Sequence, residues 1–251
     1  MRATTSDRLS INFETEGHGS PLVLLHGFGD QIASWREAGY VNPLVAAGHR
    51  LIMVDQRGHG ASGRPHDRAS YVPEKRAGDV IAVLDILGIE RADVLGYSMG
   101  GWCALNVARF HPDRVGRLVV GGCHPFGQSL SLYRWALVSK LVWAGVARTG
   151  SRSLSKGWKH RIRSNDILAL RAAVADDRPD ISASLTRFDH KCLFYAGAKD
   201  LRCELVSRSA DTLPNAKFLE LQHCDHLSAY TQPDRLIPHL VQFLAGEPAP
   251  H

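Results

Sequence analysis

A serine between two glycines, in the run Gly96-Tyr97-Ser98-Met99-Gly100, is the part of this sequence best suited to chemistry. A serine hydroxyl is a weak nucleophile unless the backbone holds it out of the fold beside a base. Residues 92–95 form an apolar segment and residues 102–110 a helical one, so the chain is expected to turn sharply from strand to helix at Ser98. Glycine suits positions 96 and 100, because the backbones that flank such a turn approach too closely for a Cβ atom. The pattern predicts that Ser98 is a catalytic nucleophile.

A serine nucleophile needs a general base, and the base needs an acceptor that fixes its tautomer. Among the 13 histidines, we favour His226, because it lies in the loop between the last predicted strand and the last predicted helix. His223 lies nearer the end of that strand and is its rival. The candidate acid is Asp200, which follows another buried strand. Asp225 is less suitable, since it is adjacent to the base and too constrained to orient it.

The same chemistry needs two backbone N–H groups directed at the negative charge that develops on a carbonyl oxygen. The amide of Met99 is one candidate, because it opens the helix after the nucleophile, where the helix dipole adds a positive potential. The amide of Phe28 is the other, in the loop after the apolar run 21–25. Glycines on both sides of Phe28 let its backbone approach a substrate closely.

Apolar runs typical of buried strands alternate with helical segments along most of the chain, and this order predicts an α/β domain. The runs are apolar on both faces, so a mostly parallel sheet covered by helices is expected. The predicted strands are residues 10–14, 21–25, 50–54, 92–95, 117–120, 193–196 and 217–221, and the predicted helices are 35–47, 74–87, 102–110 and about 233–244.

The alternation is interrupted once, between residues 124 and 185. This stretch contains Trp- and Leu-rich helical segments, such as 132–146 and 166–175, and no convincing strand. We therefore predict a helical lid at residues 124–185, inserted into a core made of residues 1–123 and 186–251.

The net charge of +5 is concentrated in the predicted lid. Between residues 126 and 175 there are nine Lys or Arg and one acid, a balance of 9 − 1 = +8, which leaves 5 − 8 = −3 for the remainder. We favour a solvated helical face over a nucleic-acid surface. The alternative is a site for a substrate carboxylate or phosphate, with these candidates: Arg134, Arg152, Lys159, Arg161 and Arg163.

Composition narrows the class of protein further. No stretch reaches the roughly 18 apolar residues of a membrane span, and no apolar run follows the first residues, so neither a membrane nor a secretory signal is expected. The five cysteines are an odd number without Cys-x-x-Cys spacing, which favours reduced thiols in a cytoplasmic protein over disulfides or a metal site. The expected partner is a small-molecule substrate.

Five blocks of the sequence together resemble the signature segments of the α/β-hydrolase fold family, in that family's order and over nearly the whole chain. The blocks are His26-Gly27-Phe28-Gly29, Asp55-Gln56-Arg57-Gly58-His59-Gly60, Gly96-Tyr97-Ser98-Met99-Gly100-Gly101, Gly197-Ala198-Lys199-Asp200 and His226-Leu227. The resemblance implies a mostly parallel central sheet flanked by helices with a short helical lid. The chain departs from the pattern before His226, where His223-Cys224-Asp225 stands in place of a frequent glycine.

The resemblance also bears on the reaction. Dehalogenases and epoxide hydrolases of this fold carry an aspartate where this chain has Ser98, so the resemblance favours the serine-nucleophile members, the small esterases, lactonases and perhydrolases. We predict a cofactor-independent serine hydrolase, without a metal, that acts on a carboxylic ester, lactone or thioester through an acyl-enzyme. A C–C bond hydrolase or lyase with the same residues, and a ligand receptor with slow turnover, are the alternatives.

Overall fold

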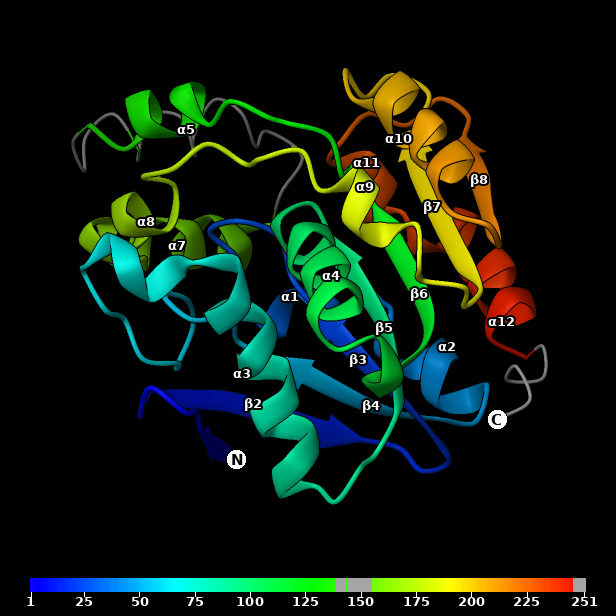
Figure 1. The fold of residues 1–251 in the computed structure, drawn as a ribbon, viewed down its shortest axis with the longest axis horizontal. Coiled ribbons are helices and arrows are strands. Elements are labelled where there is room, and N and C mark those ends of the chain that lie inside the picture. The colour runs from blue at the N-terminus through cyan, green and yellow to red at the C-terminus, as the bar shows by residue number, and fades with distance from the viewer. Residues whose placement is uncertain (139–142, 144–154, 246–251) are drawn as a thin grey trace.

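An eight-stranded sheet forms the centre of the computed structural model, which describes residues 1–138, 143 and 155–245 (Figure 1). In spatial order the strands are β1 (Arg2–Thr4), β2 (Ser10–Glu16), β4 (His49–Val54), β3 (Ser20–Leu25), β5 (Ala92–Tyr97), β6 (Val115–Gly121), β7 (Cys192–Gly197) and β8 (Ala216–Leu221). β2 pairs antiparallel with both β1 and β4, and all other neighbours run parallel. The predicted α/β fold class with its mostly parallel sheet is confirmed.

Helices cover both faces of this sheet. The described α-helices are α1 (Ala33–Glu37), α2 (Val41–Ala46), α3 (Pro73–Ile86), α4 (Met99–Phe110), α5 (Ser131–Ala136), α7 (Lys156–Ser164), α8 (Ile167–Ala173), α9 (Ser182–Leu185), α10 (Cys203–Ser209), α11 (Ser228–Thr231) and α12 (Ile237–Ala245). Figure 1 shows α3 and α4 in front of the sheet and α2 behind it.

Side chains of the strands form a separate hydrophobic cluster on each face of the sheet, because successive side chains of a strand point to opposite sides. In β5, Val94 packs with residues of α3, α4, α9 and α10. Its neighbour Leu95 packs on the other face with Trp35 of α1, Leu44 of α2 and Leu240 of α12. Both faces are therefore buried, as a strand that is apolar throughout requires.

Several elements differ from the sequence prediction, and α10 and α11 are among those that were not predicted. The predicted helix 35–47 is two helices, since the chain turns at Gly39, which has φ +92°, between α1 and α2. The predicted helix 233–244 begins as a 3-10 turn at Pro233–Arg235 and continues as α12. The N-terminal strand β1 was not predicted.

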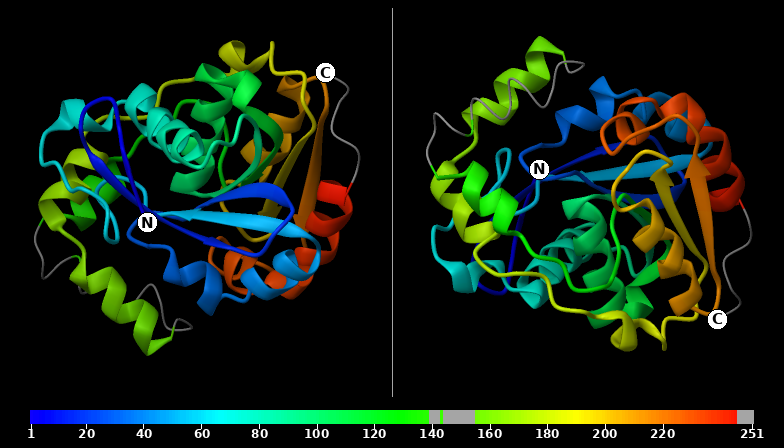
Figure 2. Two further views of the ribbon diagram at one scale, coloured as in Figure 1. Left: turned by 90° about the horizontal axis from the view of Figure 1, so that it is seen from below. Right: turned by 90° about the horizontal axis from the view of Figure 1, so that it is seen from above.

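The segment predicted as a lid contains α5, α7, α8 and α9. The first three lie together at one end of the molecule (Figure 1), and Figure 2 shows the yellow-green α7 at its periphery in both views. The segment has its own small apolar cluster, in which Leu130, Leu137 and Leu170 pack near Phe28. α9 instead packs on α4, and Leu185 belongs to the main core. Among the helices that the structure describes, none has the length and apolarity needed to cross a bilayer.

Candidate active site

The turn between β5 and α4 holds Ser98 in a strained backbone conformation. Its φ is +55° and its ψ −109°, and non-glycine residues rarely adopt a positive φ. The two glycines of the motif make this turn possible. A Cβ on Gly96 would lie 2.1 Å from the carbonyl oxygen of Gly100, and one on Gly100 would lie 1.9 Å from the carbonyl oxygen of Leu25. The result is a partly exposed serine at the start of a helix.

The structure brings Ser98, His226 and Asp200 together from three separate strand ends. His226 Nε2 lies 3.1 Å from Ser98 Oγ, and His226 Nδ1 lies 2.5 Å from Asp200 Oδ2. The imidazole can therefore accept the serine proton at one nitrogen while its other N–H donates to the carboxylate. Tyr97 donates its hydroxyl hydrogen to the carbonyl oxygen of His226 and holds the loop that carries the ring.

Asp200 is suited to its place opposite the imidazole because its side chain is only 1% exposed. Burial by itself would raise the pKa of this carboxyl, but the hydrogen bond and charge of His226, with the backbone amide and guanidinium of Arg202, hold the pKa below its ordinary value. Asp200 is thus a carboxylate that carries its charge next to the histidine. The rival residues do not compete in this structure, since His223 is exposed and Asp225 pairs with Ser228.

Two backbone amides beside Ser98 are free to bind an oxyanion. Neither the N–H of Phe28 nor that of Met99 donates a hydrogen bond to another residue that the structure describes. Asp55 anchors the loop that carries Phe28, because it accepts a hydrogen bond from the backbone N–H of Ile32. The Asn12 side chain donates a second hydrogen bond to Asp55. Within residues 1–138 and 155–245, no group of three His, Cys, Asp or Glu side chains is arranged as metal ligands would be.

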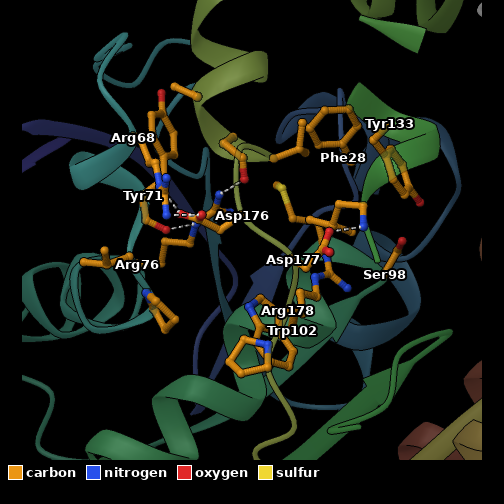
Figure 3. Close-up of a pocket in the computed structure, with 18 residues that line it drawn as sticks. Phe28, Arg68, Tyr71, Arg76, Ser98, Trp102, Tyr133, Asp176, Asp177 and Arg178 are labelled. Atoms are coloured by element: carbon orange, nitrogen blue, oxygen red, sulfur yellow. Dashed lines mark hydrogen bonds and ion pairs between the residues drawn. The ribbon is translucent and has the colours of Figure 1, made fainter. Parts of the chain in front are cut away.

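Two pockets meet at Ser98. One is called the arginine pocket here, because Arg76 and Arg178 line it, and its volume is about 160 Å³. The other is called the aromatic pocket, because Tyr97, Trp158 and Tyr230 line it, and its volume is about 330 Å³. The arginine pocket is lined by Ser98 together with residues that include Met99, Arg76, Trp102 and Arg178 (Figure 3). The aromatic pocket is lined by Ser98 together with residues that include His226, Tyr97, Trp158 and Tyr230. A molecule bound at Ser98 therefore has two chemically different spaces for its two ends.

Asp30, on the wall of the aromatic pocket, is a second buried carboxyl near the site. Its residue is 5% exposed, and burial raises its pKa to about 7. Its side chain accepts a hydrogen bond of 3.0 Å from the backbone N–H of Gln31. The ionisation state of Asp30 therefore changes near neutral pH.

Of the five cations suggested by the charge of the lid, the four that the structure describes line neither pocket. Arg134 forms an ion pair of 2.8 Å with Asp177, and Arg161 pairs with Glu37. Arg163 is exposed, and Lys159 is partly buried outside the pocket walls. Arg152 lies outside the described residues.

The cations that do line the arginine pocket were missed. Arg68 is one, and it pairs with Asp176. Arg76 was detectable in the sequence, because it stands four residues before Val80 on the apolar stripe of α3, where a charge is out of place. Arg178 follows α8, and nothing in the local pattern distinguishes it from its neighbours.

The comparisons with known proteins agree with this architecture. A model of the α/β hydrolase fold family matches residues 20–137. A dihydrolipoyllysine-residue acetyltransferase component of the acetoin cleaving system from Pseudomonas putida is 30% identical over 263 residues, which cover 97% of this chain and 69% of that protein. The crystal structure of a hydrolase from Pseudomonas aeruginosa PA01 superposes with a TM-score of 0.85 at 24% identity, covering 98% of each chain.

A shorter match is more similar in sequence. A 2-hydroxymuconate semialdehyde hydrolase from Pseudomonas sp. (strain CF600) is 41% identical over 114 residues, which cover 45% of this chain and 40% of that protein. The match thus spans less than two thirds of that relative's length.

Proposed function

Because the chain belongs to the α/β-hydrolase fold family, we propose that it hydrolyses carboxylic esters through an acyl-enzyme formed on Ser98. The contacts of His226 carry this proposal: 3.1 Å to the serine hydroxyl on one side and 2.5 Å to the buried carboxylate on the other. A nucleophile and base in contact, with the base oriented by a third group, are what acyl transfer needs.

In the proposed mechanism, Ser98 Oγ attacks the ester carbonyl carbon while its proton passes to His226 Nε2. Asp200 accepts the Nδ1–H of His226 and stabilises the imidazolium. The amides of Phe28 and Met99 bind the oxyanion, and the helix dipole of α4 adds to the positive potential there. The imidazolium returns its proton to the departing alkoxide.

Water completes the cycle. His226 deprotonates a water molecule that attacks the acyl-enzyme. When the second tetrahedral intermediate collapses, the imidazolium returns the proton to Ser98 Oγ and the carboxylic acid is released. In this scheme residues 124–185 serve as a lid. Its Tyr133 lies edge-on to Phe28, at 5.3 Å between ring centroids, and so covers the loop that supplies one of the oxyanion amides.

The test combines covalent labelling with a panel of esters. A serine-directed phosphonate is expected to label the wild-type protein once, on Ser98, and p-nitrophenyl esters of increasing acyl length are expected to release nitrophenol in repeated turnovers. Labelling at another residue would overturn the nucleophile. Single labelling without turnover of any ester would instead favour a C–C bond hydrolase or a slow ligand receptor.

A further inference from the structure

Two arginines line the arginine pocket together with Ser98, and among the described residues neither forms an ion pair with a carboxylate, although Arg76 is buried and Arg178 is partly buried. Arg76 comes from α3 and Arg178 from the chain after α8, so the fold brings them together from segments about a hundred residues apart. Figure 3 shows both side chains among the residues that line this pocket, with Trp102 beside Arg178. Buried charges in proteins are ordinarily paired, so this arrangement calls for an anion.

The guanidinium group of Arg76 is fixed by two hydrogen bonds, and its third nitrogen is left without a described acceptor. The residue is 7% exposed, its Nε donates to the carbonyl oxygen of Tyr71 at 3.0 Å, and its Nη2 donates to that of Ala173 at 2.7 Å. Its Nη1 makes no hydrogen bond to any residue that the structure describes. Burial and the nearby charge of Arg178 lower the pKa of Arg76 to about 10, which leaves it a cation at neutral pH.

Arg178 is positioned in the same way by neutral groups. Its Nη1 donates to Gln128 Oε1 at 2.9 Å, and its guanidinium lies over the indole ring of Trp102, 5.3 Å from the centroid. Among the described residues, its Nε and Nη2 have no acceptor. The pKa of His124 is lowered to about 4 by burial and by the positive charges of Arg178 and Arg202.

The acids that line this pocket are already neutralised by other cations. Asp176 pairs with Arg68 at 2.5 Å, and Asp177 pairs with Arg134 at 2.8 Å. No carboxylate of the described residues forms an ion pair with Arg76 or Arg178. The uncompensated charge of the pocket is therefore positive, and two guanidinium groups offer the donors that a carboxylate accepts.

The position of His226 decides which end of an ester lies here. His226 lines the aromatic pocket and not the arginine pocket. Of the two proposed oxyanion donors, Met99 lines only the arginine pocket of the two, and Phe28 lines both. The group that departs must lie near the imidazole that protonates it. The leaving alcohol thus belongs in the aromatic pocket and the acyl chain in the arginine pocket.

We propose that the acyl group of the substrate carries a free carboxylate, bound between Arg76 and Arg178, and that the substrate is a monoester of a dicarboxylic acid with an apolar alcohol. This inference rests on the proposed function, since it assigns the two ends of an ester at Ser98. Hydrolysis adds one water molecule and yields a dicarboxylate and the alcohol.

The experiment compares two esters that differ only in this charge, the mono(4-nitrophenyl) ester of adipic acid and its derivative in which the far carboxyl is methylated. The wild type is expected to prefer the free acid by about tenfold or more in kcat/KM, the gain from charge-assisted hydrogen bonds. Arg178→Gln is expected to remove most of this preference. The control is Arg171→Gln, which removes an exposed positive charge from the same segment and should keep the preference.

Equal kcat/KM values for the two esters in the wild type would overturn the inference while leaving the proposed function intact. A loss of preference as large in Arg171→Gln as in Arg178→Gln would also overturn it, because the effect would then be the general charge of the segment.

If the wild type hydrolyses neither ester, the proposed function fails, and calorimetry on Ser98→Ala decides the anion site separately. Binding of monomethyl adipate that is weakened at least tenfold by adding Arg178→Gln would support the site. The absence of binding would overturn it. A thermal melt of each variant establishes that it is folded. Where the wild type does hydrolyse the esters, its inhibition by adipate but not by hexanoate gives the same answer without a substitution.

Discussion

The α-carbon of Gly122 faces the imidazole of His226 so closely that a Cβ on residue 122 would lie 2.7 Å from Cε1 and 3.0 Å from Nδ1. Gly122 directly follows β6 and has φ +56°, a conformation that glycine adopts without strain. The ring that contacts Ser98 and Asp200 can therefore take its position because the residue after the neighbouring strand has no side chain.

Gly122→Ala is expected to displace the ring of His226 and to lower kcat by about a hundredfold, because small misplacements of a catalytic group cost that much. Steady-state kinetics with a p-nitrophenyl ester measure the effect. Gly78→Ala is the matched control, since a Cβ there meets nothing within 4 Å. It should leave kcat unchanged and add up to about 1 kcal/mol of stability to α3. A Gly122→Ala enzyme with the wild-type kcat would contradict the contact.

Ser98→Gly and Ser98→Ala are both expected to lose nearly all turnover, on the order of 10⁶ in kcat as in a related triad mechanism. They should differ in stability. Alanine keeps the strain of φ +55°, and glycine relieves it, so the free energy of unfolding should be about 1 kcal/mol higher for Ser98→Gly. Urea denaturation compares the two variants. A less stable glycine variant would mean that the turn is not strained.

Asp200→Asn is expected to leave the protein folded and to lower kcat by roughly 10⁴, because the amide selects the wrong imidazole tautomer. Asp225→Asn is the control, since Asp225 pairs with Ser228 rather than with His226. Parallel kcat and circular dichroism measurements distinguish lost catalysis from lost folding. If Asp225→Asn proved the more damaging change, the carboxylate would be wrongly assigned.

The raised pKa of Asp30 should make the free energy of unfolding depend on pH. Its folded pKa of about 7 exceeds its ordinary value of 3.8, so the folded state holds a proton that the unfolded chain has released. The free energy of unfolding is therefore expected to fall as pH rises from about 4 to 7, by roughly 4 kcal/mol at 1.36 kcal/mol per pKa unit.

Asp30→Asn removes this dependence. Denaturant unfolding should show the variant more stable than the wild type at pH 8, with the advantage gone at pH 4. The same difference in stability at both pH values would show that Asp30 does not titrate in this range.

Local patterns were enough to predict the elements that carry the candidate site. Buried strands that end in glycine-rich turns are recognisable individually, and in a parallel sheet their carboxyl ends lie at one edge. This is why Ser98, Asp200 and His226 could be expected to meet. Their catalytic roles stay predictions until the variants are measured.

The remaining differences depend on contacts that a local pattern does not contain. β1 is three residues long and forms only through its pairing with β2. The +8 charge of residues 126–175 can be counted in the sequence, but the partners of these cations cannot: Arg161 pairs with Glu37 of α1, and Arg134 pairs with Asp177. Arg76 could be noticed in the sequence as a charge on the apolar stripe of α3, but the lack of an ion pair at Arg76 and Arg178 depends on which carboxylates the fold brings near them.

The burial of β5 on both faces and along both edges has a consequence for hydrogen exchange. All six residues of β5 are buried, and the strand is paired with β3 on one side and β6 on the other. Amide protons in such a position exchange with solvent only when the whole domain opens. The strand that leads into Ser98 should therefore keep its deuterium label as long as any part of the molecule.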